Sequence, residues 1–116
     1  MKRFAGMITV ALVLVFSPIA LFAADATWKN VSIVDTNCHA KFTKNADAHT
    51  RSCALKCAKS GFGVITPDGK FLAFDAKGNE LATAALKSST KKDHLRATVV
   101  GEQSGETIAV KSLVLD

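Results

Sequence analysis

The 116-residue sequence contains no tyrosine, one tryptophan and two prolines. Its lysines and arginines are scattered along the chain and form no dense basic stripe. Nucleic-acid binding needs concentrated positive charge together with exposed aromatic side chains, so the sequence argues against a nucleic-acid partner. A glycine-rich phosphate loop, a nucleophile elbow and paired carboxylates are also missing. We therefore do not expect an enzyme.

A long apolar run occurs only at the N-terminus. Lys2 and Arg3 precede the apolar residues 7–16, and small residues follow as far as Ala24. A basic start, an apolar stretch and small residues at a cleavage point are typical of a secretory signal peptide. A retained membrane anchor is the alternative, because residues 4–24 have about the length that spans a bilayer.

We expect cleavage after Ala23 or Ala24; cleavage after Ala23 makes residues 1–23 the signal and residues 24–116 a single domain of 93 residues. The mature protein would then be periplasmic or secreted, with no stable membrane insertion. Two of the 15 basic residues leave with the signal, so 13 face 10 acids and the net charge is +3. This mild charge does not identify a protein or small-molecule partner.

Five short segments have the composition of strands, namely residues 31–34, 63–66, 70–74, 94–100 and 107–115. Pro67-Asp68-Gly69 predicts a hairpin between the second and third, and a turn over 101–105 predicts pairing of the last two. A change of face after Val110 predicts a bulge or bend there. The positions expected to be buried are Val64, Phe71, Leu95, Val99, Ile108 and Val110.

Two helices are expected between these strands. The first covers residues 47–59, with Asp47 as its N-cap and Gly61 at its end. The second covers residues 80–87, with Asn79 as its N-cap. When the segment 35–61 is set aside, the order of elements is β-β-β-α-β-β.

This order predicts a mainly β protein with a small five-stranded OB-like barrel. One helix lies between strands 3 and 4, and a helical insertion follows strand 1. An SH3-like barrel and an open α+β sheet are the alternatives.

The chain resembles a group of small exported bacterial proteins that carry no established activity. The residues that carry the resemblance are Trp28, Asp35, Cys38, His49-x-x-x-Cys53-x-x-x-Cys57, Gly61, the hairpin from Pro67 to Lys70, Ala97 to Gly101 and Gly105 to Ile108. The chain departs from the group at Asn30, where a glycine is expected. The resemblance implies an OB-type barrel with a cysteine-bearing insertion after the first strand, and it implies no mechanism.

All three cysteines and two of the three histidines lie within 20 residues. Thiolate and imidazole are ligands for zinc and copper, and the sequence does not choose between these metals. A straight helix separates residues 49 and 57 by about 12 Å. His49, Cys53 and Cys57 therefore cannot all bind one ion. The best ligand set is Cys53 and Cys57 with Cys38 and His39 from the loop, and His49 is the alternate.

A disulfide is the competing interpretation, because small exported domains often use such bonds. A bond from Cys38 to Cys53 or Cys57 fits the spacing better than one within the helix. Thiol redox chemistry is a third possibility, although the usual C-x-x-C is absent. Asp35 has no partner nearby in the sequence and reads as a turn former.

The sequence thus predicts an exported binding or structural module whose Cys/His site binds a transition metal. The alternative is a disulfide-stapled ligand-binding domain with neither metal nor catalysis.

Overall fold

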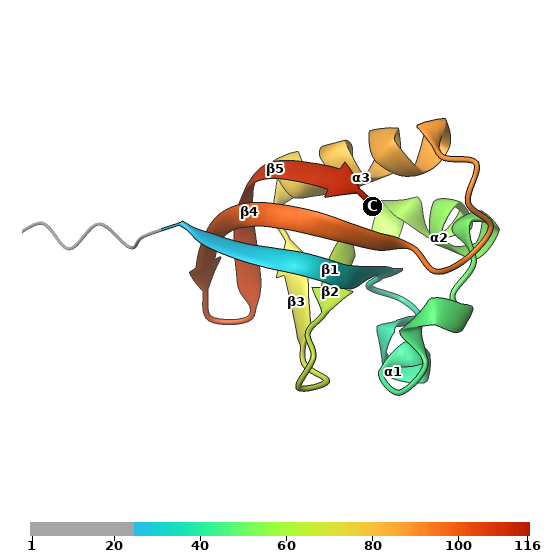
Figure 1. The fold of residues 1–116 in the computed structure, drawn as a ribbon, viewed down its shortest axis with the longest axis horizontal. Coiled ribbons are helices and arrows are strands. Elements are labelled where there is room, and N and C mark those ends of the chain that lie inside the picture. Colours follow the sequence, from blue (N-terminus) through green and yellow to red (C-terminus); the bar gives the residue numbers. More distant parts are fainter. Residues whose placement is uncertain (1–24) are drawn as a thin grey trace, which may run out of the picture.

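The structure is a computed structural model that describes residues 25–116, and it contains a closed barrel (Figure 1). The strands follow one another around it in the order β1-β2-β3-β5-β4. Their bounds are β1 Ala26–Asp35, β2 Phe62–Ile65, β3 Phe71–Phe74, β4 Arg96–Ser104 and β5 Thr107–Leu115. The prediction of a mainly β barrel with a helix between strands 3 and 4 is confirmed. The expected signal, residues 1–23, lies outside the described residues.

Both predicted strand pairings are present. Strands β2 and β3 are antiparallel, as are β4 and β5, and a parallel pairing of β3 with β5 closes the barrel. Val100 faces Ser112 while Gly101 faces Val110, so Lys111 is the extra residue of a bulge. This bulge is the bend predicted after Val110.

The turn between β4 and β5 is shorter than expected. Strand β4 continues through Gly101 to Ser104, and only Gly105 and Glu106 form the turn. The prediction that Gly101 begins the turn is wrong. A Cβ at this position would lie 2.4 Å from the carbonyl oxygen of Ala109, so Gly101 allows two backbones to approach closely within the sheet.

Strand β1 is irregular near its start. Its register with β4 shifts between Trp28 and Val31, and Asn30 has a φ of 53°. Glycine and asparagine adopt this left-handed conformation most readily. An asparagine at position 30 therefore suits this backbone.

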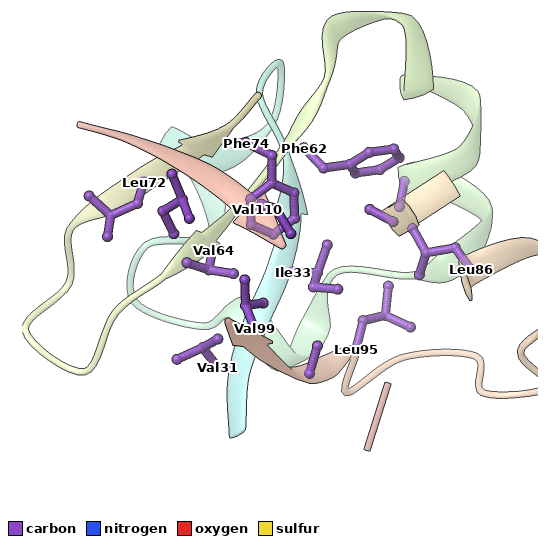
Figure 2. Packing of buried hydrophobic residues seen from close by; sticks show 14 residues of the cluster. Val31, Ile33, Phe62, Val64, Leu72, Phe74, Leu86, Leu95, Val99 and Val110 are labelled. Atoms are coloured by element: carbon purple, nitrogen blue, oxygen red, sulfur yellow. The ribbon is translucent and has the colours of Figure 1, made fainter. Parts of the chain in front are cut away.

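The inward side chains of the strands form one apolar core (Figure 2). In Figure 2 the labelled side chains run from Leu72 and Val64 at one end to Phe62 and Leu86 at the other. Of the six positions predicted to be buried, all but Phe71 are buried. Leu72 and Phe74 take the inward positions of β3, and because strand side chains alternate, Phe71 must face outward.

Helix α3, Ala76–Ser88, packs against β5. It begins four residues earlier than predicted, because the side chain of Asp75 caps it by accepting a hydrogen bond from the Gly78 N–H at 2.9 Å. The prediction of Asn79 as N-cap is wrong, since its side chain accepts from the backbone N–H of Phe62 instead. Within the described residues, no helix has both the length and the apolar character needed to cross a membrane.

The segment between β1 and β2, residues 36–61, lies at the end of the barrel where β1 finishes (Figure 1). It contains α1 His39–Phe42, the 3-10 turn η1 Ala46–Ala48, α2 Arg51–Lys56 and the 3-10 turn η2 Ala58–Ser60. The prediction of one helix over residues 47–59 is wrong. His49 has an extended backbone, and Thr50 caps α2 by accepting from the Cys53 N–H.

Candidate metal site

Asp35 stands at the centre of a buried polar group at this end of the barrel. It is the last residue of β1, and its side chain is fully buried. Its carboxylate accepts hydrogen bonds from Nε2 of His49 at 2.6 Å and from the Cys38 backbone N–H at 3.0 Å. Asp35 thus helps to form the turn, as expected, but it also joins the two residues that the sequence had placed in a metal site.

His49 is fully buried beside this carboxylate. Because an ionised carboxylate only accepts hydrogen bonds, Nε2 carries the hydrogen of this bond. Nδ1 is buried and has no hydrogen-bond partner among residues 25–116. The imidazole and the ring of Phe42 form a T-shaped pair, with 4.7 Å between the ring centroids. A buried nitrogen without a partner carries an energetic cost.

Contacts with β4 and the loop before it hold the residues on either side of His49. The Arg96 guanidinium donates to both carboxylate oxygens of Asp47, at 2.9 and 2.7 Å. These bonds, partly offset by burial, lower the pKa of Asp47 below its usual 3.8. The backbone N–H of Arg51 donates to the Lys92 carbonyl at 2.8 Å. Residues 47 and 51 are therefore fixed, and the extended residue between them directs its ring towards Asp35.

The third member of the group is Cys38, which is half-buried. Partial burial raises the pKa of its thiol above the ordinary 9.0, and the neighbouring Asp35 carboxylate and Cys57 thiol raise it further. The thiol therefore stays protonated at neutral pH. A reactive nucleophilic cysteine needs a lowered pKa, so this environment does not activate Cys38 for catalysis.

Ligand atoms of Asp35, Cys38 and His49 all lie within 4.8 Å of one another, and such a group can hold a metal ion. Zinc bond lengths of about 2.0–2.3 Å place the ligands of one tetrahedral ion roughly 3.3–3.8 Å apart. The 2.6 Å between Nε2 and the Asp35 oxygen is shorter than that. If both atoms are ligands, their hydrogen bond must open by about 0.7 Å to admit the ion.

The structure divides the five residues that the sequence offered as ligands. Cys38 and His49 belong to the compact group, and Cys57 lies near Cys38. Cys53 is exposed on α2 and lies outside the compact group.

His39 lies outside this group. Its Nδ1 lies 2.6 Å from the Thr36 carbonyl oxygen, and its ring stacks on Phe71 with 4.3 Å between the centroids. This stacked pair lines a surface groove of about 540 Å³. His39 therefore takes part in a different surface from Cys38 and His49.

Asp35 is the member of this group that the sequence reasoning missed. The one signal in the sequence was its position directly after the apolar strand residues Ile33 and Val34. All three cysteines are free thiols, so the structure contains no disulfide. No family model, no curated protein and no solved structure matches this chain.

Proposed function

We propose that this protein is an exported module that binds zinc at one end of a small barrel. The observation that carries the proposal is the convergence of a carboxylate, a thiol and an imidazole within 4.8 Å. The complete burial of His49 beside the Asp35 carboxylate supports it, because both side chains are held in place before an ion arrives. The basic and apolar N-terminus supports export.

The mixture of ligand types favours zinc over copper. Zinc accepts sulfur, nitrogen and oxygen ligands in one tetrahedral site. Copper(I) prefers soft thiolate and thioether ligands, and a carboxylate is a poor partner for it. In this proposal Asp35 is therefore the residue that favours zinc over copper.

Three protein ligands leave a fourth position on a tetrahedral ion. The Cys57 thiol lies near Cys38 and is our candidate for this position. A fourth protein ligand would make a closed site, which holds a fold together, whereas a water there would make an open one. We expect the closed form, in agreement with a binding or structural module that performs no catalysis.

The test is zinc titration of the protein, expressed from its full coding sequence, purified and kept reduced. We expect one zinc per chain, with the unfolding temperature raised by zinc and lowered again by a chelator. Cobalt should give the intense sulfur-to-metal absorption of a tetrahedral thiolate site.

Matched cysteine variants locate the site. Cys38→Ser should weaken zinc binding by at least about 100-fold, since changes even beyond the ligands cost about 10- to 100-fold. Cys53→Ser alters an exposed thiol and should leave the affinity unchanged. Equal affinity in the native protein and Cys38→Ser would refute the proposal.

A further inference from the structure

Two short stretches of chain bring the Cys38 and Cys57 thiols together. The Thr36 N–H donates to the Gly61 carbonyl at 2.9 Å, and the Asn37 N–H donates to the Ser60 hydroxyl at 3.3 Å. The Ser60 hydroxyl in turn donates to the Cys57 carbonyl at 2.7 Å. The turn before α1 is thereby tied to the end of α2. Cys38 at the start of α1 and Cys57 at the end of α2 become neighbours, although 19 residues separate them.

We propose that Cys38 and Cys57 form a reversible disulfide that excludes the metal, so that the thiol redox state controls zinc binding. This inference rests on the proposed function, since it concerns the same Cys38 sulfur. Both thiols are half-buried and so are accessible in part to a small oxidant. A sulfur in a disulfide carries no negative charge and is a poor zinc ligand. Oxidation would leave Asp35 and His49 as the only members of the group able to bind.

The oxidant is a disulfide compound, either a small one such as glutathione disulfide or a protein thiol oxidase. One of the two cysteine sulfurs attacks a sulfur of the oxidant as a thiolate and releases one reduced thiol. The second cysteine attacks the resulting mixed disulfide and releases the other reduced thiol. Two protein S–H bonds become one S–S bond, and the oxidant gains the two electrons and the two protons.

The buried Asp35–His49 pair beside Cys38 keeps its hydrogen bonds whether the Cys38 sulfur is a thiol or part of a disulfide. In the metal-free arrangement the Asp35 carboxylate accepts from His49 Nε2 at 2.6 Å and from the Cys38 backbone N–H at 3.0 Å. Neither of these bonds uses the Cys38 sulfur. Loss of the sulfur to a disulfide therefore leaves the carboxylate with its two partners, so metal release need not leave Asp35 without hydrogen bonds.

Cys53 is an internal control for which two of the three cysteines form the disulfide. It lies on α2 four residues before Cys57 and is exposed. Side chains four apart in a helix have fixed directions that make a disulfide between them awkward. We expect Cys53 to remain a free thiol when Cys38 and Cys57 are joined.

The experiment treats the reduced, metal-free protein with glutathione disulfide, maps the product by mass spectrometry and titrates both forms with zinc. We expect a 38–57 bond, a zinc affinity at least about 100-fold weaker than in the reduced form, and full recovery with dithiothreitol. Protein loaded with zinc beforehand should oxidise more slowly. Cys53→Ser should behave as the native protein, whereas Cys57→Ser should form no intramolecular bond.

The outcomes separate this inference from the proposed function. Equal zinc affinity in the oxidised and reduced forms would overturn the inference alone. A bond from Cys53 to either other cysteine as the main product would do the same. Failure of the reduced protein to bind zinc would overturn the proposed function, and the inference with it.

Discussion

The barrel and the segment 36–61 are stabilised in different ways. The barrel has continuous strand ladders and an apolar core to which every strand contributes. The segment has two short helices and two 3-10 turns, and its only buried side chains are those of His49 and Ala54. Its position depends on hydrogen bonds to Asp35, to the loop before β4 and to the residues just before β2.

This difference shows that the stability of the fold and its buried polar site come from different parts of the chain. Apolar burial stabilises the barrel without regard to direction, and it tolerates variation in which side chain fills a given space. A buried polar group must meet defined atoms at defined distances, so it requires an irregular backbone. The site therefore sits where regular structure ends, held by a scaffold that does not depend on it.

The largest expected effect is in the barrel core. Phe62 is 1% exposed, so Phe62→Ala should lower the free energy of unfolding by roughly 3–5 kcal/mol. Phe71 lies on the outer face of β3, and Phe71→Ala should cost less than about half as much. Urea denaturation of both variants measures the difference. Equal losses would place Phe71 in the core after all.

The next effect concerns the buried polar group. Asp35→Ala removes the acceptor of both the His49 ring and the Cys38 backbone N–H, and should destabilise the protein by about 2–4 kcal/mol. The exposed carboxylate of Glu80 is the matched control, and Glu80→Ala should change stability by less than about 0.5 kcal/mol. A similarly small effect of Asp35→Ala would mean that apolar burial alone supports the segment.

A third prediction concerns the pH dependence of zinc affinity. The raised pKa keeps the Cys38 thiol protonated at neutral pH, so each zinc must displace one proton from it. The Cys38 proton alone should therefore make the affinity rise about tenfold per pH unit up to the pKa of the thiol, and a second proton from Cys57 makes the rise steeper when Cys57 is the fourth ligand. The slope of zinc affinity against pH is measured by competition with a chelator of known protonation, at several pH values around neutral. An affinity independent of pH would show that no thiolate forms.

The smallest effect is at the ion pair between η1 and β4. Asp47→Asn should cost about 1 kcal/mol, a modest value because both side chains are partly exposed to solvent. A lowered pKa means that the stabilisation is complete above the ordinary value of 3.8 and disappears as the pH falls through the lowered one. The native protein and Asp47→Asn should therefore converge in stability at acid pH.

Arg96→Lys is the companion variant, since it keeps the charge and removes the bidentate hydrogen bond to Asp47. It should lose most of the same stability at neutral pH, because the bond from both guanidinium nitrogens lowers the pKa of Asp47 more than the charge does. Full retention of stability would show that charge alone holds this end of the segment.

The strands were predictable because their signals are local. Alternation places Leu95, Ala97 and Val99 on one face of β4, and the three side chains are indeed buried. Pro67-Asp68-Gly69 gives the hairpin between β2 and β3 through the backbone preferences of its own residues. The helix starts were misplaced because Asp75 and Asn79 are both good caps, and only the partners Val110 and Phe62 decide which one is used.

The sequence by itself determined the barrel, the order of its elements and the place of the cysteines and histidines in one segment. Hydrophobic periodicity and turn chemistry carry this information over a few residues. Only the tertiary structure decided which of those residues meet. Asp35 and His49 are 14 residues apart, and their contact depends on where β1 ends and on how β4 holds η1. No local pattern encodes such a contact, because it is set by the packing of elements that are distant in the chain.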